Sequence, residues 1–336
     1  MTDCRNAITD VAGLSVGHAH DARLMSGVTV LLSEKPLVAA VDVRGGGPGT
    51  RETDALGLAG TVGETHAIVL SGGSAFGLGA ATGVQCWLAE RGVGFEIGTA
   101  RVPIVPQAIL FDLLNGGDKA WGVSPPYERL AREACASAGT SFEIGSAGAG
   151  YGATTATLRG GFGTASEQLT SGIVVGALAA VNAAGSVTLG ETAHFWAAPF
   201  ERDNEYGRLG LPQEIAPGAL VPILKGHARE STTLAIVATN AKLTKPEAYR
   251  LAVMAQTGLA RAVYPVHTPL DGDVVFAVST GNAAPPDPVH GLAVLGAVAA
   301  NVLARAIARG VYEAAIAPPG WRGPPAWRTR FGGDKT

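Results

Sequence analysis

Apolar runs rich in valine and isoleucine recur along the whole chain, separated by stretches with helical spacing. Six of these runs have the length and β-branched composition of strands buried on at least one face. They are Val28–Leu32, Leu37–Val43, Ala67–Leu70, Ile173–Val181, Thr232–Asn240 and Val274–Thr280. Because strands and helices are mixed from one end to the other, the pattern predicts a layered α/β fold in a single domain, residues 1–336.

Four stretches place apolar residues at helical spacing: Ala75–Arg91, Tyr127–Ala138, Thr244–Val263 and Pro288–Tyr312. The third carries start signals, because Thr244 is a plausible N-cap and is followed by Pro246 and Glu247 in the first turn. Residues 200–230 mix charge, glycine and proline, which predicts a long exposed loop of the kind that is usually functional or disordered. Residues 318–336 predict an extended or loosely ordered tail.

Composition excludes several classes of partner. The net charge is −3 and no run of lysine and arginine exceeds two residues, so we expect no nucleic acid partner. The most apolar stretches, 173–184 and 292–303, are shorter than the roughly 18–20 residues that span a bilayer, so we expect no membrane partner. Three widely spaced cysteines and an N-terminus without a secretory pattern favour a cytoplasmic location.

Several motifs point only weakly to chemistry. Residues 145–152 (GSAGAGYG) match no strict nucleotide-binding pattern and favour a tightly packed turn. His18 and His20 lack further ligands at metal spacing, so we expect neither a metal nor another cofactor. Ser74, in SGGSAFG, does not match the nucleophile elbow G-x-S-x-G. Cys86 lies in an apolar helical pattern, which predicts a core residue.

Two segments place polar groups at the start of apolar strands. In 230–240 (ESTTLAIVATN) a charged stretch passes abruptly into a strand, with hydroxyl residues at the border. In 267–276 (HTPLDGDVVF) Asp271 and Asp273 lie two residues apart, so in an extended segment their side chains could face the same side. Taken alone, each segment also fits an ordinary strand start or an Asx-type turn.

Ordered blocks along the chain resemble the self-processing N-terminal-nucleophile aminopeptidases and amidases. This family includes the L-aminopeptidase/D-amidase-esterases, the β-peptidyl aminopeptidases and the endo-type nylon (6-aminohexanoate) oligomer hydrolases. The blocks include NAITDVAGLSVGHA (6–19), VDVRGGGPGTRETD (41–54), VPIVPQAILFDL (102–113), GSAGAGYGATTATLRGGFGTAS (145–166), VGALAAVN (175–182), STTLAIVATNA (231–241) and HTPLDGDVVFAVSTG (267–281). The last two look most similar to the nylon oligomer hydrolase branch, in which the nucleophile is threonine.

The resemblance implies that the chain cuts itself between Ser231 and Thr232, giving an α chain of residues 1–231 and a β chain of residues 232–336. A threonine hydroxyl is a poor nucleophile until a base removes its proton. The free α-amine of a new N-terminal Thr232, with a reference pKa of about 7.7–8.0, could serve as that base. Cleavage would therefore switch the activity on.

Further site residues are carried over from the resemblance. Asp271 and Asp273 match the family's acidic pair, which implies that they orient the Thr232 amine and hydroxyl. Asn182 matches an asparagine whose amide supports the oxyanion. At two possible substrate-pocket positions the chain departs from some relatives: Thr157 replaces a lysine and Phe111 replaces a tyrosine. Whether Arg159, two residues beyond Thr157, substitutes for that lysine is left open.

The resemblance implies a four-layer α/β/β/α sandwich and an amide hydrolase without metal or cofactor. The substrate would be a short peptide or amide with a free amino end, or an ω-amino-acid oligomer such as a 6-aminohexanoate oligomer. Relatives form tetramers or larger homo-oligomers, and the long apolar C-terminal helix would suit burial in such an interface. Two alternatives stay open. One is an acyltransferase of the ornithine acetyltransferase type, and the other is an unprocessed, non-catalytic relative.

Overall fold

Nine strands form one hydrogen-bonded sheet in the structure, a computed structural model that describes residues 5–226 and 231–332. The strand order is β3-β7-β4-β2-β11-β10-β9-β8, and β1 pairs with β2 beside this path. The strands are β1 (Leu14–Asp21), β2 (Ser26–Val43), β3 (Gly49–Arg51), β4 (Thr65–Ser71), β7 (Gln107–Ile109), β8 (Gly161–Gln168), β9 (Val174–Asn182), β10 (Thr232–Ala241) and β11 (Val274–Ala283).

The long strand β2 belongs to both halves of the sheet. Its first part pairs with β1 and β4, whereas its last part, from Val38 to Val43, pairs with β11. The two halves stack, because one hydrophobic core contains inward side chains from both. On β10, for example, Leu234 and Ile236 enter this inter-sheet core, and the alternate residue Ala235 faces the opposite side. That alternation is the period-2 pattern expected of a buried strand.

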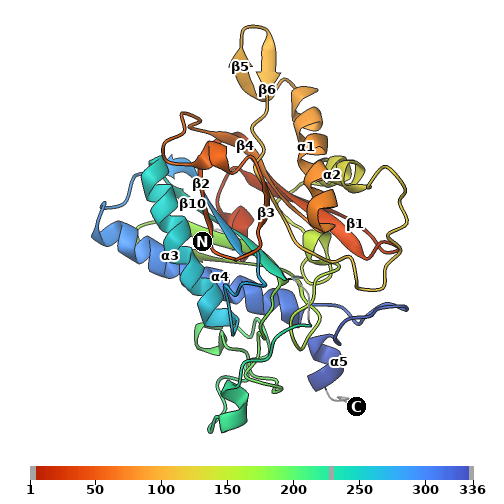
Figure 1. Cartoon of the computed structure of the whole chain (residues 1–336). Helices are drawn as coiled ribbons and strands as arrows, with labels where there is room; N and C mark the ends of the chain where they lie inside the picture. The colour runs from red at the N-terminus through yellow and green to blue at the C-terminus, as the bar shows by residue number, and fades with distance from the viewer. Residues whose placement is uncertain (1–4, 227–230, 333–336) are drawn as a thin grey trace.

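Helices cover both outer faces (Figure 1). Helices α1 (Ala80–Ala89) and α2 (Tyr127–Ala136) pack with β2 and β4 in one core, and α3 (Lys245–Ala262) and α4 (His290–Tyr312) pack on β8–β11 in another. The predicted α/β/β/α sandwich is confirmed. The remaining elements are the hairpin β5 (Phe95–Ile97) and β6 (Ala100–Val102), helix α5 (Trp327–Phe331) and the 3-10 turns Ile8–Asp10, Asp54–Leu56, Ser74–Gly79, Gly148–Gly150, Ala198–Phe200 and Pro217–Leu220.

The six predicted strand segments and the four predicted helices are all present, but Val28–Leu32 and Leu37–Val43 form one continuous strand, β2, and the other elements differ at their ends. Thr244 caps α3 as predicted, because its hydroxyl accepts the Glu247 N–H while the Glu247 carboxylate accepts the Thr244 N–H. The prediction for Cys86 is wrong: it lies on the exposed face of α1. The tail is more ordered than predicted, since α5 forms within it and Trp327 is buried against the α4 core.

Helix α4 is long and apolar enough to cross a membrane by length and composition, but two-thirds of its most apolar window, 67%, is buried inside the protein. Its small and aliphatic residues pack against β8, β9 and α3. The apolar character of this helix is therefore accounted for by the core of a single chain.

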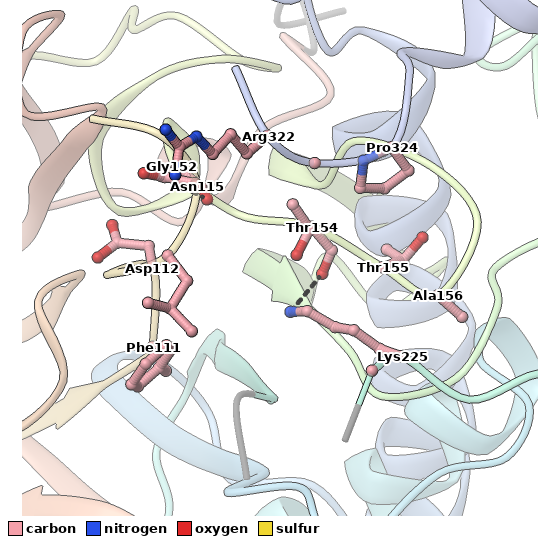
Figure 2. A pocket seen from close by; sticks show the side chains of 13 residues that line it. Phe111, Asp112, Asn115, Gly152, Thr154, Thr155, Ala156, Lys225, Arg322 and Pro324 are labelled. Carbon is pink, nitrogen blue, oxygen red and sulfur yellow. Dashed lines mark hydrogen bonds between the residues drawn. The ribbon is translucent and has the colours of Figure 1, made fainter. Parts of the chain in front are cut away.

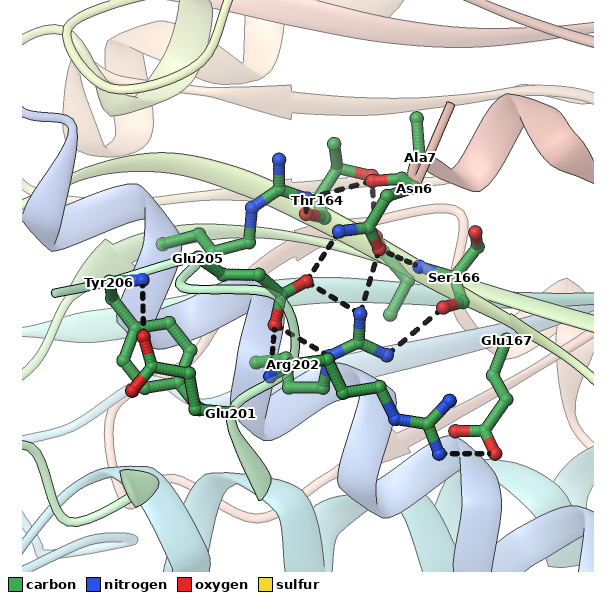
Figure 3. A network of polar contacts seen from close by, with 12 residues as sticks. Asn6, Ala7, Thr164, Ser166, Glu167, Glu201, Arg202, Glu205 and Tyr206 are labelled. Carbon is green, nitrogen blue, oxygen red and sulfur yellow. Dashed lines mark hydrogen bonds and ion pairs between the residues drawn. The ribbon is translucent and has the colours of Figure 1, made fainter. Parts of the chain in front are cut away.

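Residues 200–226 form the predicted irregular loop, and its beginning is fixed by a buried ion pair (Figure 3). The guanidinium of Arg305, on α4, donates to the carboxylate of Glu205 at 2.5 and 2.8 Å, and both side chains are less than 5% exposed. Arg305 also donates to the Ser166 carbonyl and to the side chain of Asn6, whose amide donates to Glu205. The contacts tie the loop, the N-terminal segment and β8 to α4.

Candidate active site

Three central strands bring the predicted catalytic residues to one end of the sheet. Thr232 begins β10 and lies directly opposite Asn182, the last residue of the antiparallel strand β9. Strand β11 runs parallel to β10, so Asp273, immediately before its start, lies at the same end. Ser231 forms an isolated parallel bridge with Asp271. Each of Thr232, Asn182, Asp271 and Asp273 is less than 5% exposed.

Two donors converge on the carbonyl oxygen of Ser231. The backbone N–H of Gly272 donates to it at 2.8 Å, and the Thr232 hydroxyl donates to it at 2.5 Å. A Cβ atom on residue 272 would lie 2.6 Å from the Thr232 hydroxyl oxygen. Only glycine therefore allows this close approach between the Asp271–Asp273 loop and the candidate nucleophile.

The two carboxylates accept hydrogen bonds from backbone N–H groups and from the side chains of His267 and Thr268. Asp273 accepts the N–H of Thr233 at 2.8 Å, and its second oxygen accepts the backbone N–H and the ring Nδ1 of His267. Asp271 accepts the N–H of Ala184 at 3.0 Å and two donors from Thr268. Burial raises the pKa of Asp271, and the neighbouring charge of Asp273 adds to the rise. Thus both carboxylates position the strands that flank Thr232.

The glycine run after β2 supports the same loop. Gly45 and Gly47 donate their N–H groups to the carbonyls of Asp273 and Asp271 at 3.2 and 2.7 Å. A Cβ atom on Gly45 would lie 2.2 Å from the Asp273 nitrogen, so the two backbones touch with no room for a side chain. This contact holds the block VDVRGGGPG against the block HTPLDGD.

Asn182 contacts residues that line a cavity of about 230 Å³, whose lining is shown in Figure 2. Its side-chain oxygen accepts the N–H of Thr154 at 3.0 Å and the ammonium of Lys225 at 2.8 Å, and its amide nitrogen donates to the Phe111 carbonyl at 3.0 Å. The cavity lies between three segments of the chain and the tail. Its lining is Phe111, Asp112, Leu114, Asn115, Gly152, Thr154, Thr155, Ala156, Lys225, Gly226, Arg322, Gly323 and Pro324.

The three possible substrate-pocket residues fall in different places. Phe111 lines the cavity. Thr157 does not line it; its hydroxyl is buried and contacts the Ser186 hydroxyl at 3.1 Å. Arg159 does not line it either, because its guanidinium donates to the carbonyls of Tyr151, Ala315 and Ile316. The positive charge of Arg159 anchors the tail and takes no part in the cavity wall.

Sequence reasoning missed three charged residues of the cavity: Asp112, Lys225 and Arg322. Asp112 directly follows Phe111, and Lys225 is the last lysine before Ser231 in the loop predicted to be functional. These two positions in the sequence could have identified Asp112 and Lys225 as candidate site residues. Arg322 lies in the tail, where no pattern marks it. In the described ranges no group of three or more His, Cys, Asp and Glu side chains could hold a metal ion, and His18 contacts Thr29.

Known proteins share this fold and much of this sequence. The family model for peptidase family S58 matches residues 6–318. An uncharacterized aminopeptidase of Mycobacterium tuberculosis (strain ATCC 25618 / H37Rv) is 43% identical over 330 residues, covering 92% of this chain and 94% of the relative. A 6-aminohexanoate-oligomer endohydrolase of Kocuria sp. (strain KY2) is 30% identical over 285 residues, covering 81% of this chain and 74% of the relative.

Solved structures agree on the architecture. The L-aminopeptidase D-Ala-esterase/amidase of Ochrobactrum anthropi, described as a variant of the Ntn-hydrolase fold, superposes with a TM-score of 0.70 at 21% identity, covering 99% of this chain and 96% of that one. A Burkholderia sp. beta-aminopeptidase gives 0.69 at 23% identity, covering 97% and 92%. With its Ntn-hydrolase fold and a family match across nearly its whole length, the chain belongs to peptidase family S58 and is an amide-bond hydrolase of the aminopeptidase type.

Proposed function

We propose that this hydrolase cleaves itself between Ser231 and Thr232 and then uses the freed Thr232 as its nucleophile. The observation that carries the proposal is the pair of donors on the Ser231 carbonyl, namely the Thr232 hydroxyl and the Gly272 N–H. The residue to be activated thus lies against the very peptide bond that must break. A hydrogen bond to a carbonyl oxygen also stabilises the negative charge that develops there during attack.

Self-cleavage would proceed in two steps, a shift of the acyl group from nitrogen to oxygen and the hydrolysis of the resulting ester. The Thr232 oxygen bonds to the Ser231 carbonyl carbon, the carbon–nitrogen bond breaks, and the hydroxyl proton passes to the Thr232 nitrogen, which becomes a primary amine. Water then hydrolyses the resulting ester, which leaves a carboxylate on Ser231 and restores the hydroxyl. Gly272 donates to the oxyanion in both steps. These two steps use no cofactor.

The mature site would act on substrates in the same way. The Thr232 amine takes the hydroxyl proton, the hydroxyl oxygen attacks the substrate carbonyl, and water releases the acyl group. Asn182 lies opposite Thr232. In the proposed reaction its side-chain amide nitrogen would donate to the substrate oxyanion. Asp271 and Asp273 keep the strands on both sides of the nucleophile in register.

The substrate class follows from the relatives. Since one relative is named a 6-aminohexanoate-oligomer endohydrolase and others are named aminopeptidases, we infer that short peptides or ω-amino-acid oligomers are the substrates. A homo-oligomer of four or more chains and a cytoplasmic location are further proposals, which gel filtration and fractionation of the source cells would test.

The first experiment is the intact mass of the freshly purified protein under denaturing conditions. Two species that divide the chain at Ser231–Thr232 support the proposal, and Edman sequencing of the smaller one should begin at Thr232. A single full-length mass that persists on incubation contradicts it and favours the unprocessed relative. Assays of the cleaved protein on amide panels with and without an amine acceptor then separate hydrolysis from acyl transfer.

A further inference from the structure

We infer that the tail segment 315–325 is a wall of the substrate cavity, that Arg159 holds this wall in place, and that the wall limits the length of the substrate. The inference deepens the proposed function and rests on it for the identity of the cavity as the substrate site. It depends on two observations. The tail supplies part of the cavity lining, and one buried residue holds the tail at both of its ends.

The tail forms one side of the cavity beside Asn182. Arg322, Gly323 and Pro324 belong to the lining, and Figure 2 shows Arg322 and Pro324 on the side opposite Phe111. With a volume of about 230 Å³, the cavity is smaller than the roughly 300–1,000 Å³ of typical ligand pockets, so it holds only a short part of an oligomer. The match to the family model ends at residue 318, and this wall therefore lies outside the matched part of the chain.

Arg159 holds both ends of the tail segment. Its guanidinium donates to the carbonyls of Ala315 at 2.9 Å and Ile316 at 3.1 Å, and its backbone N–H donates to the Pro325 carbonyl at 2.8 Å. Between these ends, the guanidinium carbon lies 4.7 Å from the ring centre of Trp321, which is a cation–π contact. Arg159 is only 1% exposed, and a cation buried in this way is costly unless it is well bonded. These contacts therefore stabilise the guanidinium and the tail together.

The tail also fits closely against the rest of the cavity. The backbone N–H of Arg322 donates to the Asn115 carbonyl at 2.9 Å. A Cβ atom on Gly323 would lie 2.7 Å from a ring carbon of Trp321 and 2.8 Å from the methyl carbon of Thr154. A substrate too long for the cavity can therefore enter on this side only by displacing the tail.

This arrangement links substrate length to the position of the tail. Because a long substrate binds only when the tail has moved, its apparent affinity is reduced by the fraction of molecules in which the tail is open. A substitution that frees the tail should raise that fraction, and should raise the affinity for long substrates by the same factor. Short substrates fit the closed cavity, so their affinity should not change.

The test measures opening of the tail and binding separately, in a T232A background where turnover cannot interfere. Trypsin cleaves after Arg322, and the rate of this cut, followed by mass spectrometry, reports opening. Calorimetric titration gives the affinities for the linear dimer and tetramer of 6-aminohexanoate. We expect R159Q to raise the trypsin rate and the affinity for the tetramer by one common factor of about tenfold, and to leave the affinity for the dimer unchanged. R159K, which keeps the charge but not the planar fork, should have a smaller effect.

A second variant reaches the same result without changing Arg159. Gly323→Ala should push the tail away from Trp321 and Thr154 and also favour the tetramer, which keeps the inference testable if R159Q does not fold. Gly218→Ala is the matched control and should change neither readout, since no atom lies within 4 Å of its added Cβ.

Several outcomes would overturn the inference. They are equal affinities for dimer and tetramer in the T232A protein, no binding of either, an unchanged trypsin rate in R159Q, and a freed tail with unchanged affinity for the tetramer. A merely structural role of Arg159 would lower the Tm without changing the preference for the dimer. Both measurements use uncut protein, so a failure of self-cleavage in the intact-mass experiment is distinguishable from a failure of this inference.

Discussion

Two buried polar clusters in this molecule differ in what surrounds them. The Arg305 network (Asn6, Ser166, Glu205, Arg305) pairs opposite charges between α4, the long loop and the N-terminal segment. The Thr232 cluster (Thr232, Asn182, Asp271, Asp273) pairs carboxylates with backbone N–H groups at the end of the sheet. Only the second adjoins the 230 Å³ cavity, through Asn182 and its contacts with Thr154 and Lys225.

This difference distinguishes a cluster that stabilises the fold from a cluster suited to catalysis. In the Arg305 network the positive charge of Arg305 and the negative charge of Glu205 are paired with each other. In the Thr232 cluster two carboxylates lie two residues apart, and burial with the neighbouring charge raises the pKa of Asp271. Perturbed like-charged groups beside a cavity are typical of reactive sites, whereas matched ion pairs are typical of structural ones. Substitutions in the two clusters should therefore have different consequences.

The largest effect is expected from Thr232→Ala. Without the hydroxyl the chain should stay at full length, and amide hydrolysis should fall by at least about 10⁴-fold, as for loss of a catalytic nucleophile. Intact mass and a substrate assay measure both. Thr232→Ser keeps a hydroxyl and should still be cut. Normal cleavage of the alanine variant would rule out Thr232 as the nucleophile.

Gly272→Ala should block maturation without unfolding the protein. The added Cβ would lie 2.6 Å from the Thr232 oxygen, so the hydroxyl or the donating N–H must move away from the Ser231 carbonyl. We expect cleavage to slow by about 10²–10³-fold, the effect of losing one oxyanion donor, as followed by gel densitometry over time. Gly218→Ala is the matched control, since no atom lies within 4 Å of its added Cβ. Equal cleavage rates in the two variants would exclude a role for the Gly272 contact.

Glu205→Gln should act on stability instead. It leaves Arg305 buried without a matching charge, so we expect the free energy of unfolding to fall by about 3–5 kcal/mol. Urea denaturation followed by circular dichroism measures this. Glu133→Gln, which removes an exposed partner of Arg129, should cost less than about 1 kcal/mol. Loss of cleavage in a folded Glu205→Gln protein would show that the network also serves the active site.

The smallest effect is the pH dependence of that stability. Burial alone would raise the pKa of Glu205, but the hydrogen bonds and charge of Arg305, together with Asn6, outweigh it and leave the pKa lowered. The stabilisation from ionised Glu205 is thus complete above its unfolded pKa of about 4.3 and is lost as the pH falls through the lower folded value. Unfolding at pH 3 and pH 6 should show a smaller difference in Glu205→Gln than in the parent. If the variant and the parent show the same difference in stability between pH 3 and pH 6, ionisable groups other than Glu205 cause the acid sensitivity.

The sequence predicted those parts of the molecule that are periodic. Strand β10 follows from its apolar, β-branched run and helix α3 from its capping residues, whereas the meeting of Asn182 with Thr232 in one site follows only from the family resemblance. The cavity could not be predicted in this way. Lys225 and Arg322 lie in irregular segments, where contacts between distant parts of the chain, and not local preference, decide the conformation. Arg159 shows the same limit, because its neighbours in sequence do not reveal that the tail covers it.

The place of β10 in the sheet has a consequence for assembly. Strands β10 and β11 lie between β2 and β9, so the proposed β chain would form the middle of a sheet whose outer strands all belong to the α chain. The backbone ladders on both sides hold the two pieces together after the bond between them is gone. We expect those ladders to form while the chain is still continuous, since a separate β chain would have to insert between β2 and β9. Under the proposed cleavage, the uncut chain would guide its own assembly, and the cut would follow once the sheet has formed.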